Sequence, residues 1–494
     1  MDIFRKKPLW AYEADSKKSD LKRVLNKWAL TSLGIGAIIG GGIFTLTGIA
    51  ANIYAGPALA ISFIIAGVGC LFAALSYAEF ASVLPVEGSA YAYAYGTIGE
   101  LFAWFIGWNL ILEYMMGATT VAVAWSGYFD KLLHLFGISI PYYLVNDYPT
   151  AVKIAEQMHL PAPSFSVNVP AFLISWVVTL ILVKGIKEAA NTNNIIVILK
   201  IAVVLFVILV GAFYVKTENW HPFIPEPIKD PTNGDIRYGW QGILTAATIV
   251  FFAYIGFDAV STQAGEAVNP KKDVPFAIIA SLLICTALYV GVSLVLTGMA
   301  RYDKLDLKAP VASAFAEAGI PWATYLITIA ATAGLISVML VMMLGQTRIF
   351  LGMAKDKLIP PSLFGAIHPK FKTPYKSTLL VGGIISIVSA VTPIQNVSEM
   401  TSMGTLLAFT MVSIAVLVLR YKEPHLERPF KVKALPLVAG GGALFNIVLM
   451  TQVRNETWHA FIVWGILGII VYFLYGYKHS RLNELSKENN QASA

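Results

Sequence analysis

Long apolar runs alternate with short polar segments along the chain from about residue 30 onward. A run of roughly 20 apolar residues, at about 1.5 Å of rise per residue, is long enough to cross the ~30 Å hydrocarbon core of a bilayer as a helix. The pattern therefore predicts an all-α integral membrane protein with twelve transmembrane helices. We place the twelve predicted spans at 31–50, 57–81, 98–128, 170–184, 193–215, 239–263, 277–300, 322–350, 376–392, 399–420, 435–452 and 459–477.

The first run contains a concentration of glycine, in the sequence GIGAIIGGGIF at 34–44. Gly41 lies ten residues after Thr31, about 15 Å along a helix and so near the bilayer midplane. Each glycine costs a helix roughly 1 kcal/mol relative to alanine. Close helix packing through Gly36 and Gly40, a GxxxG pair, is one explanation. Three adjacent glycines favour another, a helix that breaks where a transporter holds its substrate.

The sixth run carries a second interruption, FFAYIGFDA at 251–259. Phe252 is about 18 Å along the helix from Trp240, so this interruption also lies near the midplane. Runs one and six enter the membrane from opposite sides in this topology. Two oppositely directed broken spans, five apart, predict a 5+5 inverted repeat.

The third and eighth runs each exceed about 25 residues, and we expect both helices to be strongly tilted. The repeat divides the chain into units of different role. The predicted units are a basic cytoplasmic N-terminal segment at 1–29, a first repeat at 30–215, a second repeat at 239–421, two extra helices at 435–477 and a cytoplasmic tail at 478–494.

Lysine and arginine are unevenly distributed between the two sets of loops. Most of the 36 Lys and Arg residues fall in the two terminal segments and in the loops on the same side of the membrane. The positive-inside rule then predicts a multi-pass protein of the cell membrane with both termini in the cytoplasm. The net charge of +7 reflects this inner excess, and attraction to anionic lipid of the inner leaflet is a sufficient role for it, so no nucleic-acid partner is expected.

Composition and motifs exclude several other classes. With 57% hydrophobic and 13% charged residues, the chain is not a soluble protein. Both cysteines, Cys70 and Cys285, fall within predicted spans, so neither a disulfide framework nor a thiolate metal site is expected. There is no phosphate-binding GxxxxGK loop. The sequence therefore predicts a protein that is not an enzyme and that uses no cofactor and no metal.

Several motifs together resemble a known family. They are LKRVL at 21–25 leading into the glycine cluster, YAEF at 77–80, GSAY at 88–91, GWNLILEY at 107–114, VAVAWS at 121–126, GFDAVST with GEAVNPKKDVP within 256–275, MGTLLAF at 403–409 and VLVLRY at 416–421. The sequence is similar to the amino acid, polyamine and organocation (APC) superfamily, and within it to bacterial members, with twelve spans, of the cationic amino acid transporter branch.

The resemblance implies a secondary active amino acid transporter that works by alternating access as a proton symporter. An exchanger of the same fold and a non-transporting amino acid sensor are the alternatives. A channel is disfavoured, because it would need a continuous polar path. Small neutral and cationic L-amino acids both remain candidate substrates.

An amino acid zwitterion needs donors for its carboxylate and acceptors for its ammonium group. A broken helix supplies free N–H groups at one half and free C=O groups at the other. For the carboxylate we predict the amides of Gly41 and Gly42, and Phe252 is predicted to cover the substrate, unless it is an ordinary core aromatic. For the ammonium group we predict the carbonyls of Ile38, Ile39, Phe251, Ala253 and Ile255.

Three further side chains are candidate site residues. Glu113 lies in mid-membrane, where a charged side chain costs at least ~2.5–3.5 kcal/mol. We predict that it binds protons or pairs with a cationic substrate. The alternative is a neutral Glu113 that donates a hydrogen bond to a backbone carbonyl. Lys200 is predicted to couple the driving proton, since in the resembling family a lysine here takes the place of sodium and contacts the first helix near Gly36. The alternative is that Lys200 extends to the membrane surface. Met339 is predicted to form the pocket floor.

Overall fold

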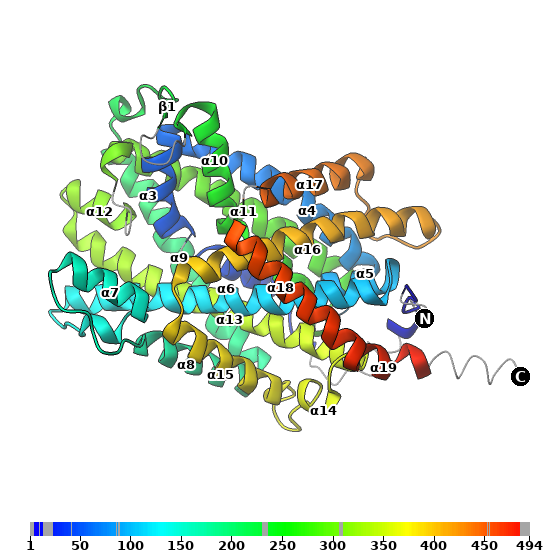
Figure 1. Cartoon of the computed structure of the whole chain (residues 1–494). Coiled ribbons are helices and arrows are strands. Elements are labelled where there is room, and N and C mark those ends of the chain that lie inside the picture. Colours follow the sequence, from blue (N-terminus) through cyan, green and yellow to red (C-terminus); the bar gives the residue numbers. More distant parts are fainter. Residues whose placement is uncertain are drawn as a thin grey trace, which may run out of the picture.

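The computed structural model describes residues 4–8, 10–12, 23–40, 42–84, 86, 89–229, 236–305, 310–451, 453 and 455–484. These residues form a bundle of helices, and the only strands among them are the short pair β1 (Ile228–Lys229) and β2 (Ile236–Arg237) (Figure 1). The principal helices are α2 (Lys27–Ile38), α4 (Leu59–Val83), α5 (Ala90–Thr97), α6 (Glu100–Leu135), α7 (Tyr148–Gln157), α8 (Val169–Lys184), α9 (Ile186–Gly211), α10 (Gly239–Phe251), α11 (Pro270–Met299), α12 (Pro310–Glu317), α13 (Pro321–Lys355), α14 (Pro361–Phe364), α15 (Tyr375–Val391), α16 (Ile394–Lys422), α17 (Leu435–Met450), α18 (Asn455–Val471) and α19 (Tyr477–His479).

Eight helical segments of the described residues are long and apolar enough to cross a membrane. Three apolar helices of 10–17 residues, α8, α15 and α17, accompany them. The prediction of an all-α integral membrane protein is thereby confirmed. The count of twelve spans, the inverted repeat and the division of the chain into units stay predictions.

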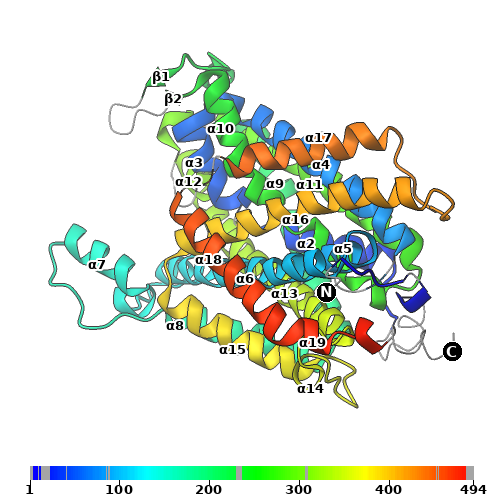
Figure 2. The ribbon, with the colours of Figure 1, turned by 45° about the vertical axis from the view of Figure 1, so that its right-hand side comes forward.

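Two long helices cross the centre of the molecule side by side, α6 with 36 residues and α13 with 35 (Figures 1 and 2). Their length agrees with the extended apolar runs seen in the sequence. Around them pack α4 with α11, α8 with α15, and α16 with α17. This arrangement surrounds two interrupted helices, which we call the first broken helix (27–55) and the second broken helix (239–266).

The first broken helix is interrupted at the glycine cluster. Its first part, α2, ends at Ile38, and Ile39 is extended with φ −75° and ψ 105°. Helical structure resumes as a π-helix at Gly42–Leu46 (η1), followed by α3 (Thr47–Ile49) and a second π-helix at Ala50–Ala55 (η2). The interruption predicted from the sequence is present.

The second broken helix is interrupted at Gly256. After α10 the chain forms a 3-10 turn at Phe252–Tyr254 (η7), and the second half is a 3-10 helix at Phe257–Glu266 (η8). Gly256 has φ +124°, a conformation that residues with a Cβ rarely adopt. A Cβ there would also lie 2.7 Å from the Cβ of Ala37 in α2. Glycine is therefore required both by the backbone and by the neighbouring helix.

The described N- and C-terminal segments lie at the same end of the bundle, which we call the N-terminal face (Figure 1). Ion pairs fix the N-terminal segment there, Arg5 to Glu100 at 2.9 Å and Lys7 to Asp356 at 2.5 Å. Just before α2, Leu25 forms a parallel bridge with Ala267, so the two broken helices are joined at this face.

Candidate functional site

A narrow cavity lies between the two interruptions. Residues from both broken helices, from α6, from α13 and from α16 line it, and almost all of them are apolar or glycine. The lining residues are Ala37, Ile38, Gly40, Gly42, Gly117, Val121, Phe252, Ala253, Ile255, Val338, Met342 and Thr401.

Half of the ten predicted substrate-site residues line this cavity: Ile38, Gly42, Phe252, Ala253 and Ile255. Gly41 lies outside the described residues. The remaining four are buried next to the cavity or one helical turn away and do not line it: Ile39, Phe251, Glu113 and Met339. The structure therefore brings the two predicted interruptions together at one site.

The two interruptions touch at Gly42 and Ala253. A Cβ on Gly42 would lie 2.4 Å from the Cβ of Ala253 and 2.7 Å from its Cα. No side chain fits there unless the two backbones separate. The glycine thus serves close approach of the two broken helices, in addition to weakening the first one.

Tyr289, in α11, bridges the two interruptions from the side. Its hydroxyl oxygen is 2.7 Å from the carbonyl oxygen of Ile38 and 2.9 Å from that of Ala253. One O–H proton serves both acceptors, so these two helix-end carbonyls keep capacity to accept a further donor. Tyr289 was not among the predicted site residues; the available signal was a tyrosine in the middle of a predicted span.

Lys200, in α9, binds the end of α2. Its ammonium group donates to the carbonyl of Gly36 at 2.9 Å and to the carbonyl of Ile39. Ser337 in α13 donates to the same Gly36 carbonyl at 2.8 Å. The predicted contact between Lys200 and the first helix near Gly36 is present, and the bond from Ser337 joins the same carbonyl to α13.

The position of Lys200 has an electrostatic reason. Its side chain is fully buried and has no ion-pair partner among the described residues. A buried charge is unstable unless it is paired or hydrogen-bonded. The unpaired carbonyls at the C-terminal end of α2 carry the negative pole of the helix dipole, and they supply the stabilisation that a carboxylate would otherwise give.

Glu113, in α6, belongs to a second cluster of buried polar side chains, separate from that of Lys200. One carboxylate oxygen, Oε1, accepts a hydrogen bond of 2.6 Å from Thr405, whereas Oε2 has no hydrogen-bond partner among the described residues. A Cβ on Gly404 would lie 3.0 Å from the Cβ of Glu113, so α16 packs closely against this carboxylate. Beside it, the hydroxyl of Tyr114 donates to Asp258 at 2.8 Å.

The walls of the cavity were not predicted. Gly117 and Val121 lie four and eight residues after Glu113 in α6, on the same helix face. That spacing was the available signal for them. On α13 the cavity is lined by Val338 and Met342, whereas Met339 is fully buried and does not line it. No feature of the sequence indicated that Thr401, in α16, would line the cavity.

Comparisons with a family model and with individual proteins agree on one family. A family model described as amino acid permease matches residues 25–473. The chain is 46% identical to the branched-chain amino acid permease BcaP of Bacillus subtilis (strain 168), over 98% of this chain and 99% of that protein. It is 43% identical to the methylthioribose transporter of the same organism, with the same coverage. It is 38% identical to the vacuolar cationic amino acid transporter 4 of Arabidopsis thaliana, over 82% of this chain and 64% of that protein.

Proposed function

The chain belongs to the amino acid permease family, and from this premise we propose that it carries apolar L-amino acids across the cell membrane by proton-coupled symport. The substrate binds in the cavity between the two broken helices, and alternating access exposes it to each side in turn. The proposed architecture has twelve spans, a 5+5 inverted repeat and both termini in the cytoplasm.

The observation that supports an apolar substrate is the composition of the cavity lining. Of its twelve residues only Thr401 has a polar side chain, and that hydroxyl donates to the carbonyl of Val397 at 2.8 Å. The lining contains no carboxylate, so the side chain of a bound lysine or arginine would lose its hydration without gaining a partner. A branched aliphatic side chain needs only apolar walls. The branched-chain permease among the relatives agrees with this choice.

The helix interruptions supply the groups for the charged backbone of the substrate. The carbonyls of Ile38 and Ala253, which share the Tyr289 hydroxyl, are the proposed acceptors for the ammonium group. The amide of Gly42, with that of Gly41, is the proposed donor to the carboxylate, because it lies at the N-terminal start of a helical segment. The proposed cover over the substrate is Phe252.

Two buried groups are the proposed elements of proton coupling. Glu113 has an oxygen without a partner among the described residues, in a position one helical turn from the cavity wall at Gly117. Lys200 holds the end of α2, so its loss of a proton would weaken its hydrogen bonds to the carbonyls of Gly36 and Ile39, because a neutral amine is a weaker donor. Proton binding at Glu113 and proton release at Lys200 thus couple to the arrangement of the first broken helix.

Uptake into proteoliposomes tests the proposal. We expect saturable accumulation of radiolabelled leucine under an inward proton gradient, with no effect of sodium. Uptake that needs leucine inside the vesicles would indicate an exchanger, unsaturable flux a channel, and binding without flux a sensor; each of these results would contradict symport.

Competition against leucine tests the substrate class. Isoleucine and valine are expected to compete, and lysine is not. Methylthioribose, named for one relative, is a sugar derivative whose hydroxyl groups would find few polar partners in this lining, so it is expected to compete weakly or not at all. Stronger competition by lysine or methylthioribose than by isoleucine would overturn the assignment.

A further inference from the structure

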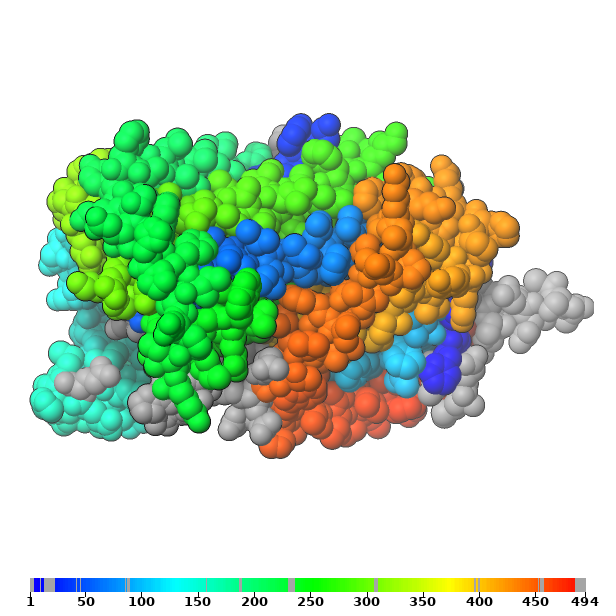
Figure 3. All heavy atoms as spheres, turned by 90° about the horizontal axis from the view of Figure 1, so that it is seen from above, coloured from blue at the N-terminus to red at the C-terminus, as the bar shows by residue number. Residues whose placement is uncertain are grey.

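A second hollow lies on the outer surface of the bundle at the N-terminal face, between the start of α11 and the segment that joins α16 to α17. In the space-filling view the light green end of α11 lies against the orange atoms of that segment (Figure 3). We call it the α11 groove, and it is lined by Lys271, Lys272, Pro275, Phe276, Ile279, Ala280, Leu283, Pro429 and Phe430.

The α11 groove changes from basic to apolar along its length. Lys271 and Lys272 lie in the first turn of α11, and Leu283 lies 12 residues further on, about 18 Å along the helix. That length is close to the ~15 Å depth of one leaflet's hydrocarbon region. Between the ends the surface is apolar and open, since Phe276 is 40% exposed and Leu283 is 52% exposed. The groove therefore has the length and polarity of one lipid molecule.

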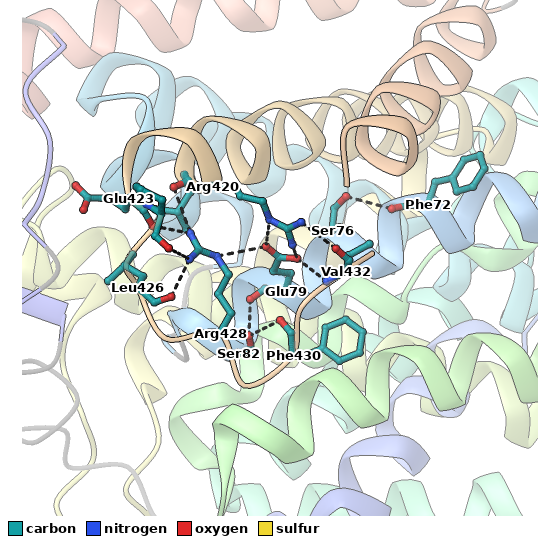
Figure 4. Close-up of polar contacts among 12 residues, drawn as sticks. Phe72, Ser76, Glu79, Ser82, Arg420, Glu423, Leu426, Arg428, Phe430 and Val432 are labelled. Carbon is teal, nitrogen blue, oxygen red and sulfur yellow. Dashed lines mark hydrogen bonds and ion pairs between the residues drawn. The ribbon is translucent and has the colours of Figure 1, made fainter. Parts of the chain in front are cut away.

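The opposite wall of the groove is fixed in place. Pro429 and Phe430 belong to the segment between α16 and α17, and the Phe430 carbonyl accepts a hydrogen bond of 3.2 Å from Ser82 in α4. Two residues further on, the amide of Val432 donates to the carboxylate of Glu79 at 2.8 Å (Figure 4).

The same carboxylate of Glu79 also binds the guanidinium groups of Arg420 and Arg428 (Figure 4). Arg428 in turn donates to the carbonyls of Leu426 and Glu423, each at 2.8 Å. The carboxylate is 1% exposed, and removing one partner from such a network leaves the other charges unpaired. The network therefore holds this wall as a defined surface. It also gives Glu79 a structural role, the holding of this segment.

The rim of the groove is positively charged. Lys271 and Lys272 are exposed and form no ion pair with any described residue. The ammonium group of Lys27 lies 5.3 Å from the ring centroid of Phe276. The neighbouring acid Asp273 accepts from the backbone amide of Asn269 at 3.3 Å. The cationic rim thus has free charge available for an anion.

We propose that the α11 groove binds an anionic phospholipid. The phosphate group contacts Lys271 and Lys272, and one acyl chain lies along Phe276 as far as Leu283. A lipid is the occupant because α11 is one of the membrane-crossing helices, so the surface next to Leu283 faces hydrocarbon, where only an acyl chain is available. The lysine pair then selects among lipids by the charge of the headgroup. This site is independent of what the central cavity carries.

Lipid binding to the purified, delipidated full-length protein tests the proposal. In native mass spectrometry we expect phosphatidylglycerol to bind more tightly than phosphatidylcholine of the same chains, by roughly 5-fold for each lysine and so about 30-fold for the pair. The Lys271→Gln/Lys272→Gln variant should lose this preference. The matched control, Lys370→Gln/Lys372→Gln, removes the same charge from another loop and should keep it.

Two further measurements distinguish binding of a lipid from binding of a small anion and from nonspecific attraction of anions to a basic surface. Inorganic phosphate and glycerophosphoglycerol, which lacks acyl chains, should not displace phosphatidylglycerol at equal concentration. Displacement by either would mean that the rim binds an anion alone, and would overturn the assignment. Equal affinity of wild type for the two lipids, or an equal loss of preference in both lysine variants, would do the same.

Discussion

The interruption of the first broken helix is held by side chains from other helices, whereas that of the second is set largely by its own backbone. Lys200 and Ser337 reach the Gly36 carbonyl from α9 and α13. In the second broken helix, Gly256 adopts φ +124° and turns the chain, and the nearest charged side chain, Asp258, belongs to the same helix. Tyr289 donates to a carbonyl of each interruption.

The difference shows which interruption can respond to a proton. A break that depends on a charged hydrogen bond loses much of its support when the charge is removed, because a neutral amine is a weaker donor to the buried carbonyls. At the second interruption the nearest carboxylate, Asp258, is bound by Tyr114, and the turn itself is set by the conformation of Gly256. We therefore expect changes at the first broken helix to affect transport most.

The largest effect is expected where the two interruptions touch. In the Gly42→Val variant the new side chain would overlap Ala253, so the two backbones must separate. We expect leucine binding, measured by thermal shift, to be abolished while the protein still purifies as a folded monodisperse species. Gly440→Val is the control, because a Cβ at Gly440 has no atom within 4 Å. Wild-type leucine affinity in Gly42→Val would refute the assigned site.

Removing the charged support from the first interruption should come next. Lys200→Ala removes this donor from both carbonyls; Gly36 keeps its hydrogen bond from Ser337, whereas Ile39 is left unpaired at a cost of about 1–3 kcal/mol. Proton-driven uptake should fall at least tenfold. The control is Lys216→Ala, an exposed lysine shortly after α9. If Lys200→Ala still accumulates leucine under a pH gradient, Lys200 is not the coupling element.

Breaking the bridge that both interruptions share should have an intermediate effect. Tyr289→Phe removes one hydroxyl and leaves the carbonyls of Ile38 and Ala253 without their donor. We expect a lower melting temperature without substrate and a larger stabilisation by leucine than in wild type, because the substrate ammonium then supplies the missing donor. An equal leucine-induced shift in both proteins would argue against these carbonyls as ammonium acceptors.

The smallest effect should come from a wall that belongs to neither interruption. A Cβ on Gly117 would make ordinary contacts of 3.4 Å with Thr401 and 3.7 Å with Met342, so Gly117→Ala fits and narrows the cavity. Competition by isoleucine should weaken about 10-fold relative to alanine, since one methyl group is worth roughly 1–3 kcal/mol in an apolar pocket. Gly127→Ala, on the same helix with no atom within 4 Å, is the control. An unchanged ratio would place the substrate side chain elsewhere.

Much of the architecture follows from local sequence signals. The apolar runs specify membrane helices because in hydrocarbon every backbone group must be paired within the chain. Clustered glycine at 40–42 and the single glycine at 256 weaken the helix where they stand, so both interruptions could be predicted from the sequence. Lys200 could be singled out because it is a cation inside an apolar span.

The inward faces of the helices were decided only by the tertiary structure. A soluble helix shows its buried face as a stripe of apolar residues, but a membrane helix is apolar all round, so its pattern does not tell which side turns inward. For this reason Met339 was predicted at the site where Met342 lies. Likewise, Tyr289 reaches the two interruptions, and Thr401 reaches the cavity, only through contacts between segments far apart in the chain. The sequence by itself determined where the helices break, and packing determined what surrounds the breaks.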